Sequence, residues 1–562
     1  MLMSVRRGAV PGALLFAALA LAALSSLGGT TRPQAAARSA AYEDLVALFK
    51  DWREFQKPKM VDGVPDYSEA AMREQQRGLE AYKRRLAAID PGGWPVPRQV
   101  DYHILRAETN GLDFDHRVRR PWATNPAFYV TVFSSESDQP AREGPFAVGS
   151  VELWQYTFPL DPQASQRLAT ALAPIPKLLE QARRNLTGGG RDLWTFGIQS
   201  IREQSARLQA LAARLTDADA ELRRTVERAR TATDEFAAWL ESRAASRAGP
   251  SGVGIEAYDW YLKHVQLLPY TWRDEVVLME RELSRAHAAL TLEEQRNAGL
   301  PELSPVASQG EYTRRFNEAV TEYLSFLRER NLLTVHPDMD AALRERLGRF
   351  SPGPREFFAE VDYREPLTMR LHGFHWFDKA WMRREPPPSP IRAEPLLYNI
   401  FNTRTEGLAT AWEEMMMQAG LFDRRPRARE LIYILLAQRA ARALGELRMH
   451  ANQATLEEAA AFAAANTPHG WLRLDGRLVR SEQHLYLQQP GYGTSYLIGK
   501  IQIERLLADR RRQLGAAFTM RRFMDDLVAA GLIPMSLIRW QVMGELPPDL
   551  REVMTLPAAE DR

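Results

Sequence analysis

Two histidines and an aspartate lie close together in the segment Leu371-His-Gly-Phe-His-Trp-Phe-Asp378. If this segment is helical, His372, His375 and Asp378 fall on one stripe of the helix, because residues three apart are neighbours on its surface. Imidazole and carboxylate groups together bind zinc and harder divalent cations. The alternative is that the imidazoles cap the helix or pack against Trp376 and its aromatic neighbours. The spacing leaves both interpretations open.

Two glutamates further along the chain form a second candidate. Glu406 and Glu413 are seven residues apart, which places them two turns apart on one face of a helix. The rest of that face is apolar, and inward carboxylates are costly there unless they bind a cation, pair with a base or titrate. Pairing with Arg404, Arg439 or Arg442 is the structural alternative.

A third candidate is the segment 482–500, which contains His484, a Pro-Gly turn and Tyr496. A turn of this kind at a helix start can direct tyrosine hydroxyls into a cleft, and such a donor commonly stabilises a developing oxyanion. A helix entry with packed aromatic side chains would leave the same pattern.

Composition excludes several other chemistries. The 562 residues include no cysteine, which excludes a disulfide framework, thiolate zinc sites, iron–sulfur clusters and a cysteine nucleophile. The sequence also lacks His-Glu-x-x-His, a Gly-x-Ser-x-Gly elbow, a phosphate-binding loop and a dinucleotide fingerprint in its proper context. Lys and Arg number 73 and Asp and Glu 71, so the basic excess of a dedicated nucleic-acid binder is absent. Any metal here would have His, Asp or Glu ligands.

The elements that must position these residues are mostly helices. From Tyr42 onward, apolar residues recur at the i, i+3, i+4 spacing of amphipathic helices. Residues 121–162 are rich in Pro, Gly, Ser and aromatics, which predicts a long loop or a short strand pair. Residues 246–254 are the best candidate linker. We therefore predict a mainly α protein, a large helical bundle with a central cleft, with an N-terminal lobe over 41–250 and a C-terminal lobe over 251–562 that carries the candidate site.

The first 40 residues are typical of an export signal. Arg6 and Arg7 precede an apolar run from Ala13 to Leu27, and small residues follow. This order is that of a secretory signal peptide. The apolar run is short for a bilayer span of ~20 residues, so no stable membrane span is expected after cleavage. We expect the mature protein in the periplasm or outside the cell.

The C-terminal half resembles the bacterial family known as domain of unknown function 885. The family pattern Glu-Gly-Trp-Ala-Leu-Tyr-Ala-Glu is similar to Glu406-Gly-Leu-Ala-Thr-Ala-Trp-Glu413. An Arg-rich family helix that ends in Asp-x-x-x-His is similar to Arg439 through His450. The family's Tyr-x-x-x-Pro-Gly and Ser-Tyr-x-x-Gly elements are similar to residues 486–499, and residues 254–262 also resemble the family's usual segment.

This resemblance implies a helical fold like that of the gluzincin metallopeptidases. It also implies a zinc-dependent hydrolase or peptidase that acts on a small molecule or peptide in the central cleft. By the resemblance, Glu406 is the downstream metal ligand and His372 is one imidazole ligand. His375 or Asp378 would supply the third ligand.

The family's metal motif, His-Glu-x-x-Pro-Gly-His-His, is degenerate in this chain. His372 matches its first histidine, but Gly373 stands where the catalytic glutamate belongs. The Pro-Gly pair is absent, and Asp378 and Lys379 occupy the positions of the paired histidines. A hydrolase of this class needs a general base beside the metal, and loss of a base typically costs 10²–10⁴-fold in rate.

The residues that move protons must then come from elsewhere in the chain. Glu413, Glu414 and His484 are the candidate bases, and Tyr496 and His450 are the candidates for stabilising the reacting oxygen or orienting the substrate. We predict an exported hydrolase-like protein whose remodelled site holds zinc or another divalent metal. A catalytically silent member that keeps the helical cleft, with a metal or with none, and binds a peptide or other ligand is the alternative, and a purely structural envelope protein is the third hypothesis.

Overall fold

The computed structural model describes residues 41–216 and 219–556, and this part of the chain is mainly α, as predicted. The predicted signal peptide over 1–40 lies outside the described residues. Strands β1 (Met60–Val61) and β2 (Val64–Pro65) form an antiparallel pair. Strands β3 (Val132–Phe133) and β4 (Val151–Glu152) form a parallel pair inside residues 121–162, the segment predicted to be a long loop or a short strand pair. None of the described helices combines the length and apolar character that a bilayer crossing requires.

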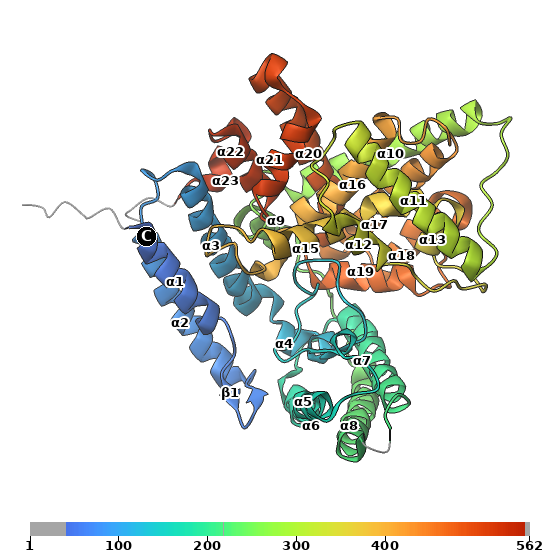
Figure 1. The fold of residues 1–562 in the computed structure, drawn as a ribbon. Coiled ribbons are helices and arrows are strands. Elements are labelled where there is room, and N and C mark those ends of the chain that lie inside the picture. The colour runs from blue at the N-terminus through green and yellow to red at the C-terminus, as the bar shows by residue number, and fades with distance from the viewer. Residues whose placement is uncertain (1–40, 217–218, 557–562) are drawn as a thin grey trace, which may run out of the picture. The chain divides into compact units, whose positions relative to one another are not determined.

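The helices of the first half precede the predicted linker. They are α1 (Tyr42–Phe55), α2 (Glu69–Ala87), α3 (Val96–Phe114), α4 (Pro121–Thr124), α5 (Pro162–Leu172), α6 (Ile175–Asn185), α7 (Arg191–Ala212) and α8 (Ala220–Ala244). Helices α7 and α8 pack along each other, as Figure 1 shows.

The helices of the second half carry all the predicted site residues. They are α9 (Ile255–His264), α10 (Trp272–Arg296), α11 (Gln309–Glu329), α12 (Asp338–Arg344), α13 (Phe357–Arg364), α14 (Pro366–His372), α15 (Phe374–Arg384), α16 (Asn402–Gln418), α17 (Ala428–His450), α18 (Leu456–Ala465), α19 (Leu478–Gln488), α20 (Tyr492–Leu514), α21 (Met520–Ala529), α22 (Met535–Met543) and α23 (Arg551–Met554). Helix α17 is buried on nearly all sides, which is the pattern of a helix at the centre of a large protein.

Buried apolar side chains gather in two main clusters. The first joins α1–α3 to the helices from α9 onward and includes Trp52 and Trp412. The second lies within residues 64–240 and includes Trp194 and Phe236. The N-terminal helices α1–α3 thus share a core with the C-terminal half. The division into lobes near residue 250 stays a prediction.

Helices α16 and α20 touch at a pair of glycines. A Cβ atom added to Gly407 would lie 2.4 Å from Gly499 Cα, a distance that real Cβ atoms do not reach. Glycine at both positions therefore allows the two backbones to approach closely. This contact brings the first turn of α20, which contains Tyr492, beside Glu406 on α16.

The histidine segment is not one continuous helix. Helix α14 ends at His372 and α15 begins at Phe374, with Gly373 between them. A Cβ atom on Gly373 would lie 2.9 Å from a methyl carbon of Leu343, so a larger residue would require a neighbour to move. The break redirects the chain, and His372 and His375 approach one point from two different helices rather than from a single stripe.

Candidate metal centre

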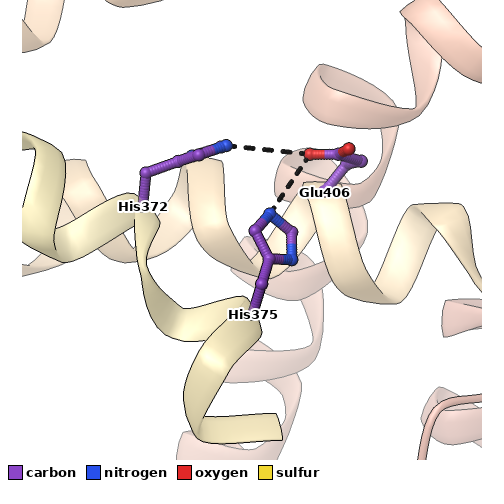
Figure 2. Close-up of side chains that lie close together, drawn as sticks. All are labelled: His372, His375 and Glu406. Atoms are coloured by element: carbon purple, nitrogen blue, oxygen red, sulfur yellow. Dashed lines mark ion pairs between the residues drawn. The ribbon is translucent and has the colours of Figure 1, made fainter. Parts of the chain in front are cut away.

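The structure brings His372, His375 and Glu406 together (Figure 2). His375 Nε2 lies 3.4 Å from Glu406 Oε2, and His372 Nε2 lies 3.8 Å from the same oxygen. One ligand atom from each residue lies within 4.8 Å of the other two. The three residues come from the end of α14, the first turn of α15 and the first half of α16. Within the described ranges, no other group of three His, Asp or Glu side chains meets this criterion.

The distances between these atoms fit a zinc ion. Ligand atoms ~2.1 Å from a tetrahedral zinc lie roughly 3.4 Å from one another. Two imidazoles and one glutamate also form the ligand set of several catalytic zinc sites, in which the fourth position is left open.

The hydrogen bonding of the ligand atoms fits an ion as well. Both ring nitrogens of His375 and the Oε2 atom of Glu406 are buried and make no hydrogen bond within the described structure. Nearly all buried polar atoms in proteins have a partner, and a cluster without one needs an explanation. A cation bound between His375 Nε2 and Glu406 Oε2 would supply a partner for these two atoms.

The other carboxylate oxygen of Glu406 is held by two donors. Gln139 Nε2 donates to Glu406 Oε1 at 3.0 Å, and the Tyr492 hydroxyl donates to the same oxygen at 2.9 Å. Groups that hold a ligand by its second polar atom fix its orientation and tune its basicity. Gln139 and Tyr492 therefore leave Oε2 directed toward the two imidazoles.

His372 is oriented in a similar way by its second ring nitrogen. His372 Nδ1 lies 3.1 Å from both Glu413 Oε1 and Arg439 Nη2, and Arg439 binds both oxygens of Glu413 at 2.7 and 2.8 Å. This ion pair holds the imidazole by Nδ1, so Nε2 is the ring nitrogen that faces Glu406; in the tautomer that donates its Nδ1 proton to Glu413, Nε2 would have a lone pair for a metal. In this structure Glu413, one of the predicted catalytic residues, supports the ligand His372.

In the absence of an ion, His375 and Glu406 carry opposite charges. Burial lowers the pKa of His375, but the carboxylates of Asp138 and Glu406 outweigh burial and raise this pKa to about 9. Burial raises the pKa of Glu406, and the two imidazoles outweigh it and lower this pKa to about 2. The pair is thus an imidazolium and a carboxylate. A divalent cation must displace the imidazolium proton when it binds, so the proton competes with the ion.

Asp378 is not at the ligand cluster. Its two oxygens accept hydrogen bonds from Arg404 at 3.0 and 2.8 Å, and both side chains are buried. Of the two residues predicted as alternatives for the third ligand, the geometry therefore favours His375.

Two other predicted residues, Tyr496 and Glu414, each lie beside an arginine side chain. The Tyr496 ring is 6.1 Å from the Tyr492 ring, and the guanidinium of Arg442 lies 5.3 Å from the Tyr496 ring centre. Tyr496 thus borders the site beside a cation. Glu414 is paired with Arg285 at 2.9 Å and with Lys500 at 3.1 Å.

The two remaining histidines among the predicted site residues, His450 and His484, are buried and are not part of the ligand cluster. His450 Nε2 hydrogen bonds to the carbonyl oxygen of Tyr486 at 3.1 Å, and burial lowers the pKa of His450 to about 4. His484 packs against the ring of Phe196 at 5.8 Å, and burial lowers its pKa to about 3. Both imidazoles are therefore neutral, and neither is among the three ligand residues.

Glu446 fixes the helix start that carries Tyr492. Its carboxylate accepts hydrogen bonds from the backbone N–H groups of Gly491 at 2.6 Å and Thr494 at 3.0 Å, and from the Tyr258 hydroxyl at 3.0 Å. A carboxylate at a helix N-terminus satisfies free N–H groups and opposes the helix dipole favourably. The Arg-rich block of α17 therefore helps to position the tyrosine that holds Glu406.

Sequence reasoning missed the contribution of the segment between β3 and β4. Gln139 reaches Glu406 across 267 residues of chain, and Glu143 Oε1 lies 3.1 Å from the Tyr492 hydroxyl. The available signal was indirect: a long irregular segment in a compact helical protein is commonly functional. It did not identify which residues reach the site.

The chain belongs to the family described as "Bacterial protein of unknown function (DUF885)", which it matches over residues 55–362 and 375–542. The match omits residues 363–374, the stretch that contains His372 and Gly373. The family membership predicted from the sequence is thereby confirmed.

Two solved structures share the fold. One is described as "a putative lipoprotein of unknown function" from Shewanella oneidensis, with 15% identity and a TM-score of 0.66 over 90% of this chain and 100% of that chain. The other, a "putative lipoprotein" from Colwellia psychrerythraea, has 14% identity and a TM-score of 0.62 over 90% of this chain and 99% of that chain. No curated protein matches the sequence. At these identities the likeness shows the fold alone.

Proposed function

We propose that this protein is an extracytoplasmic metal-dependent hydrolase that holds one zinc ion with His372, His375 and Glu406. The observation that carries the proposal is the convergence of these three side chains, of which His375 and Glu406 present buried atoms without a hydrogen-bond partner. The export signal predicted over 1–40 and the description of both structural neighbours as lipoproteins support the compartment. A peptide is the substrate class that the family resemblance favours.

A zinc ion at this position would polarise a substrate carbonyl and activate a water molecule. The chain must then supply a proton acceptor, because Gly373 replaces the motif glutamate. Three carboxylates near the site are unsuited to accept a proton because each is paired with a buried arginine: Glu413, Asp378 and Glu482.

Glu143 is the carboxylate that we propose for this role. It has no basic partner among the described ion pairs, and it contacts the hydroxyls of Tyr492 at 3.1 Å and Ser137 at 2.8 Å. Burial and the charge of Asp138 raise the pKa of Glu143. A raised pKa suits a carboxylate that takes up a proton near neutral pH.

Substitution Glu143→Gln is expected to lower turnover by about 10²–10⁴-fold and to leave the zinc content unchanged, because the amide keeps the shape but cannot accept the proton. The measurement is the hydrolysis of a peptide mixture, followed by mass spectrometry, beside metal analysis of the same samples. Glu74→Gln, which changes an exposed carboxylate far from the site, is the control. Equal turnover by wild type and Glu143→Gln would assign proton transfer to another residue.

The proposed function itself is tested by metal removal and return. We expect the purified protein to bind one zinc per chain, to lose peptide hydrolysis after chelation and to regain it with zinc. A protein that binds no stoichiometric zinc contradicts the proposal.

A zinc-bound protein without turnover would support a second candidate, a catalytically silent binding protein. The observation that favours this candidate is Gly373 at the position of the catalytic glutamate. In that case zinc would be expected to raise the affinity for a peptide ligand, which a binding titration would detect.

A further inference from the structure

The segment 134–150 leaves and returns to the protein at neighbouring points. It connects β3 to β4, in which Val132 pairs with Val151 and Phe133 with Glu152. Arg142, which lies between Gln139 and Glu143 in the sequence, ties the middle of the loop to β4, since its guanidinium binds both oxygens of Glu152 at 2.8 and 2.6 Å. A loop whose ends meet in this way can move as a unit on a fixed base.

The tip of this loop covers the metal centre. Gln139 is 1% exposed and donates to Glu406, and Glu143 contacts Tyr492, the other donor to that carboxylate. His375 and Glu406 are 2% and 3% exposed beneath this cover. A ligand that approaches them from the side of the loop must displace Gln139.

A second contact ties the loop to the helix that carries His375. Glu136 accepts hydrogen bonds from Lys379 Nζ at 2.6 Å and Arg346 Nη1 at 2.9 Å, and Lys379 also donates to the carbonyl oxygen of Ser137 at 2.6 Å. The Arg346 guanidinium lies 3.8 Å from the ring centre of Trp376, so the indole ring packs against it. These side chains are partly exposed, so water can compete for them when the contact opens.

Two glycines stand between the tip and the fixed base. Gly144 has φ of 111° and Gly149 has φ of 103°, values that other residues rarely adopt. Glycine at these positions tolerates backbone conformations that would strain other residues, a property that hinge residues often have.

From this arrangement we propose that residues 134–150 form a lid over the metal centre, with Gln139 as a positioning residue for Glu406. The pairing of Glu136 with Lys379 and Arg346 is the latch that sets how fast a metal ion enters and leaves. This inference rests on the proposed function, because it requires that the His372, His375 and Glu406 site binds an ion. It adds a means by which the chain controls access to that site.

The latch is tested by the rate of metal release. Full-length protein is loaded with zinc and mixed with excess chelator in a stopped-flow instrument, and free zinc is followed with a chromophoric dye. Substitutions Lys379→Met and Glu136→Gln are each expected to speed release by at least about tenfold, because the lid then opens more often. Hydrogen exchange of the peptide 134–150 should rise in the same variants.

Lys59→Met is the matched control. It breaks an exposed Lys59–Glu74 pair with an N–O distance of 2.7 Å, which shares no residue with the latch, and should release zinc at the wild-type rate. Arg346→Met is a further latch variant. It is used in place of Lys379→Met or Glu136→Gln if the melting curve of either one shows that it has not folded.

Gln139→Ala tests the positioning role separately. We expect a 10–100-fold loss of equilibrium zinc affinity, the usual effect of removing a group that orients a metal ligand. The absorption spectrum of the cobalt-loaded variant should also differ from that of wild type, since the spectrum reports the geometry of the ligands. An unchanged affinity and spectrum would remove Gln139 from this role.

Two failures are distinguishable. If wild type binds no zinc, the proposed function falls and the lid falls with it. If wild type binds zinc but folded Lys379→Met, Glu136→Gln and Arg346→Met release it at the wild-type rate, the lid alone is refuted.

Discussion

Replacing Glu406 by alanine is expected to lower zinc affinity by roughly 10²–10³-fold. The apparent binding free energy of a structural zinc site, about 10–16 kcal/mol over four ligands, assigns each ligand about 2.5–4 kcal/mol. Glu406 is the residue that both imidazoles face, and its Oε2 atom has no other partner in the described structure. A competition titration against a chromophoric chelator measures the affinity directly.

Histidine variants provide a matched comparison for this prediction. His375→Ala should lose zinc affinity as severely as Glu406→Ala, because both remove one ligand. His484→Ala should keep the wild-type affinity, since His484 packs against Phe196 and is not a ligand. Zinc affinity that survives in Glu406→Ala but is lost in His484→Ala would place the metal centre elsewhere.

The sequence predicted the helical fold and part of this site for physical reasons. Amphipathic periodicity is a local property, and it identified most helices because their buried faces repeat every three or four residues. His372 and Glu406 were predicted through the motif that surrounds each residue. Both predictions depended on information that lies within a few residues of the position concerned.

The remaining features of the site depend on tertiary geometry. The choice between His375 and Asp378, which both lie on α15, turned on the side chain that each one meets: His375 faces Glu406, whereas Asp378 pairs with Arg404. Asp378 could not be excluded without knowing that Arg404, on another helix, lies opposite it. Gln139 reaches Glu406 from a loop with no periodic pattern, so no local signal connected the two residues.

The same pairing makes Asp378 informative about stability. Substitution Asp378→Ala is expected to destabilise the protein by about 3–5 kcal/mol, because it leaves the Arg404 guanidinium buried without a counterion. The Arg404 side chain is fully buried, and its Nε atom already lacks a hydrogen-bond partner. Denaturant unfolding measures the change. Glu318→Ala, which breaks an exposed pair with Arg314, should change stability by no more than about 1 kcal/mol.

Zinc binding separates this structural role from metal ligation. Folded Asp378→Ala protein should bind zinc with nearly the wild-type affinity, whereas the ligand variant Glu406→Ala should lose affinity. The double variant Asp378→Leu/Arg404→Met should recover much of the lost stability, because removing both charges leaves neither one buried alone. A loss of zinc affinity in Asp378→Ala as large as that in Glu406→Ala would instead make Asp378 a ligand, and Arg404 would then be its partner only while the ion is absent.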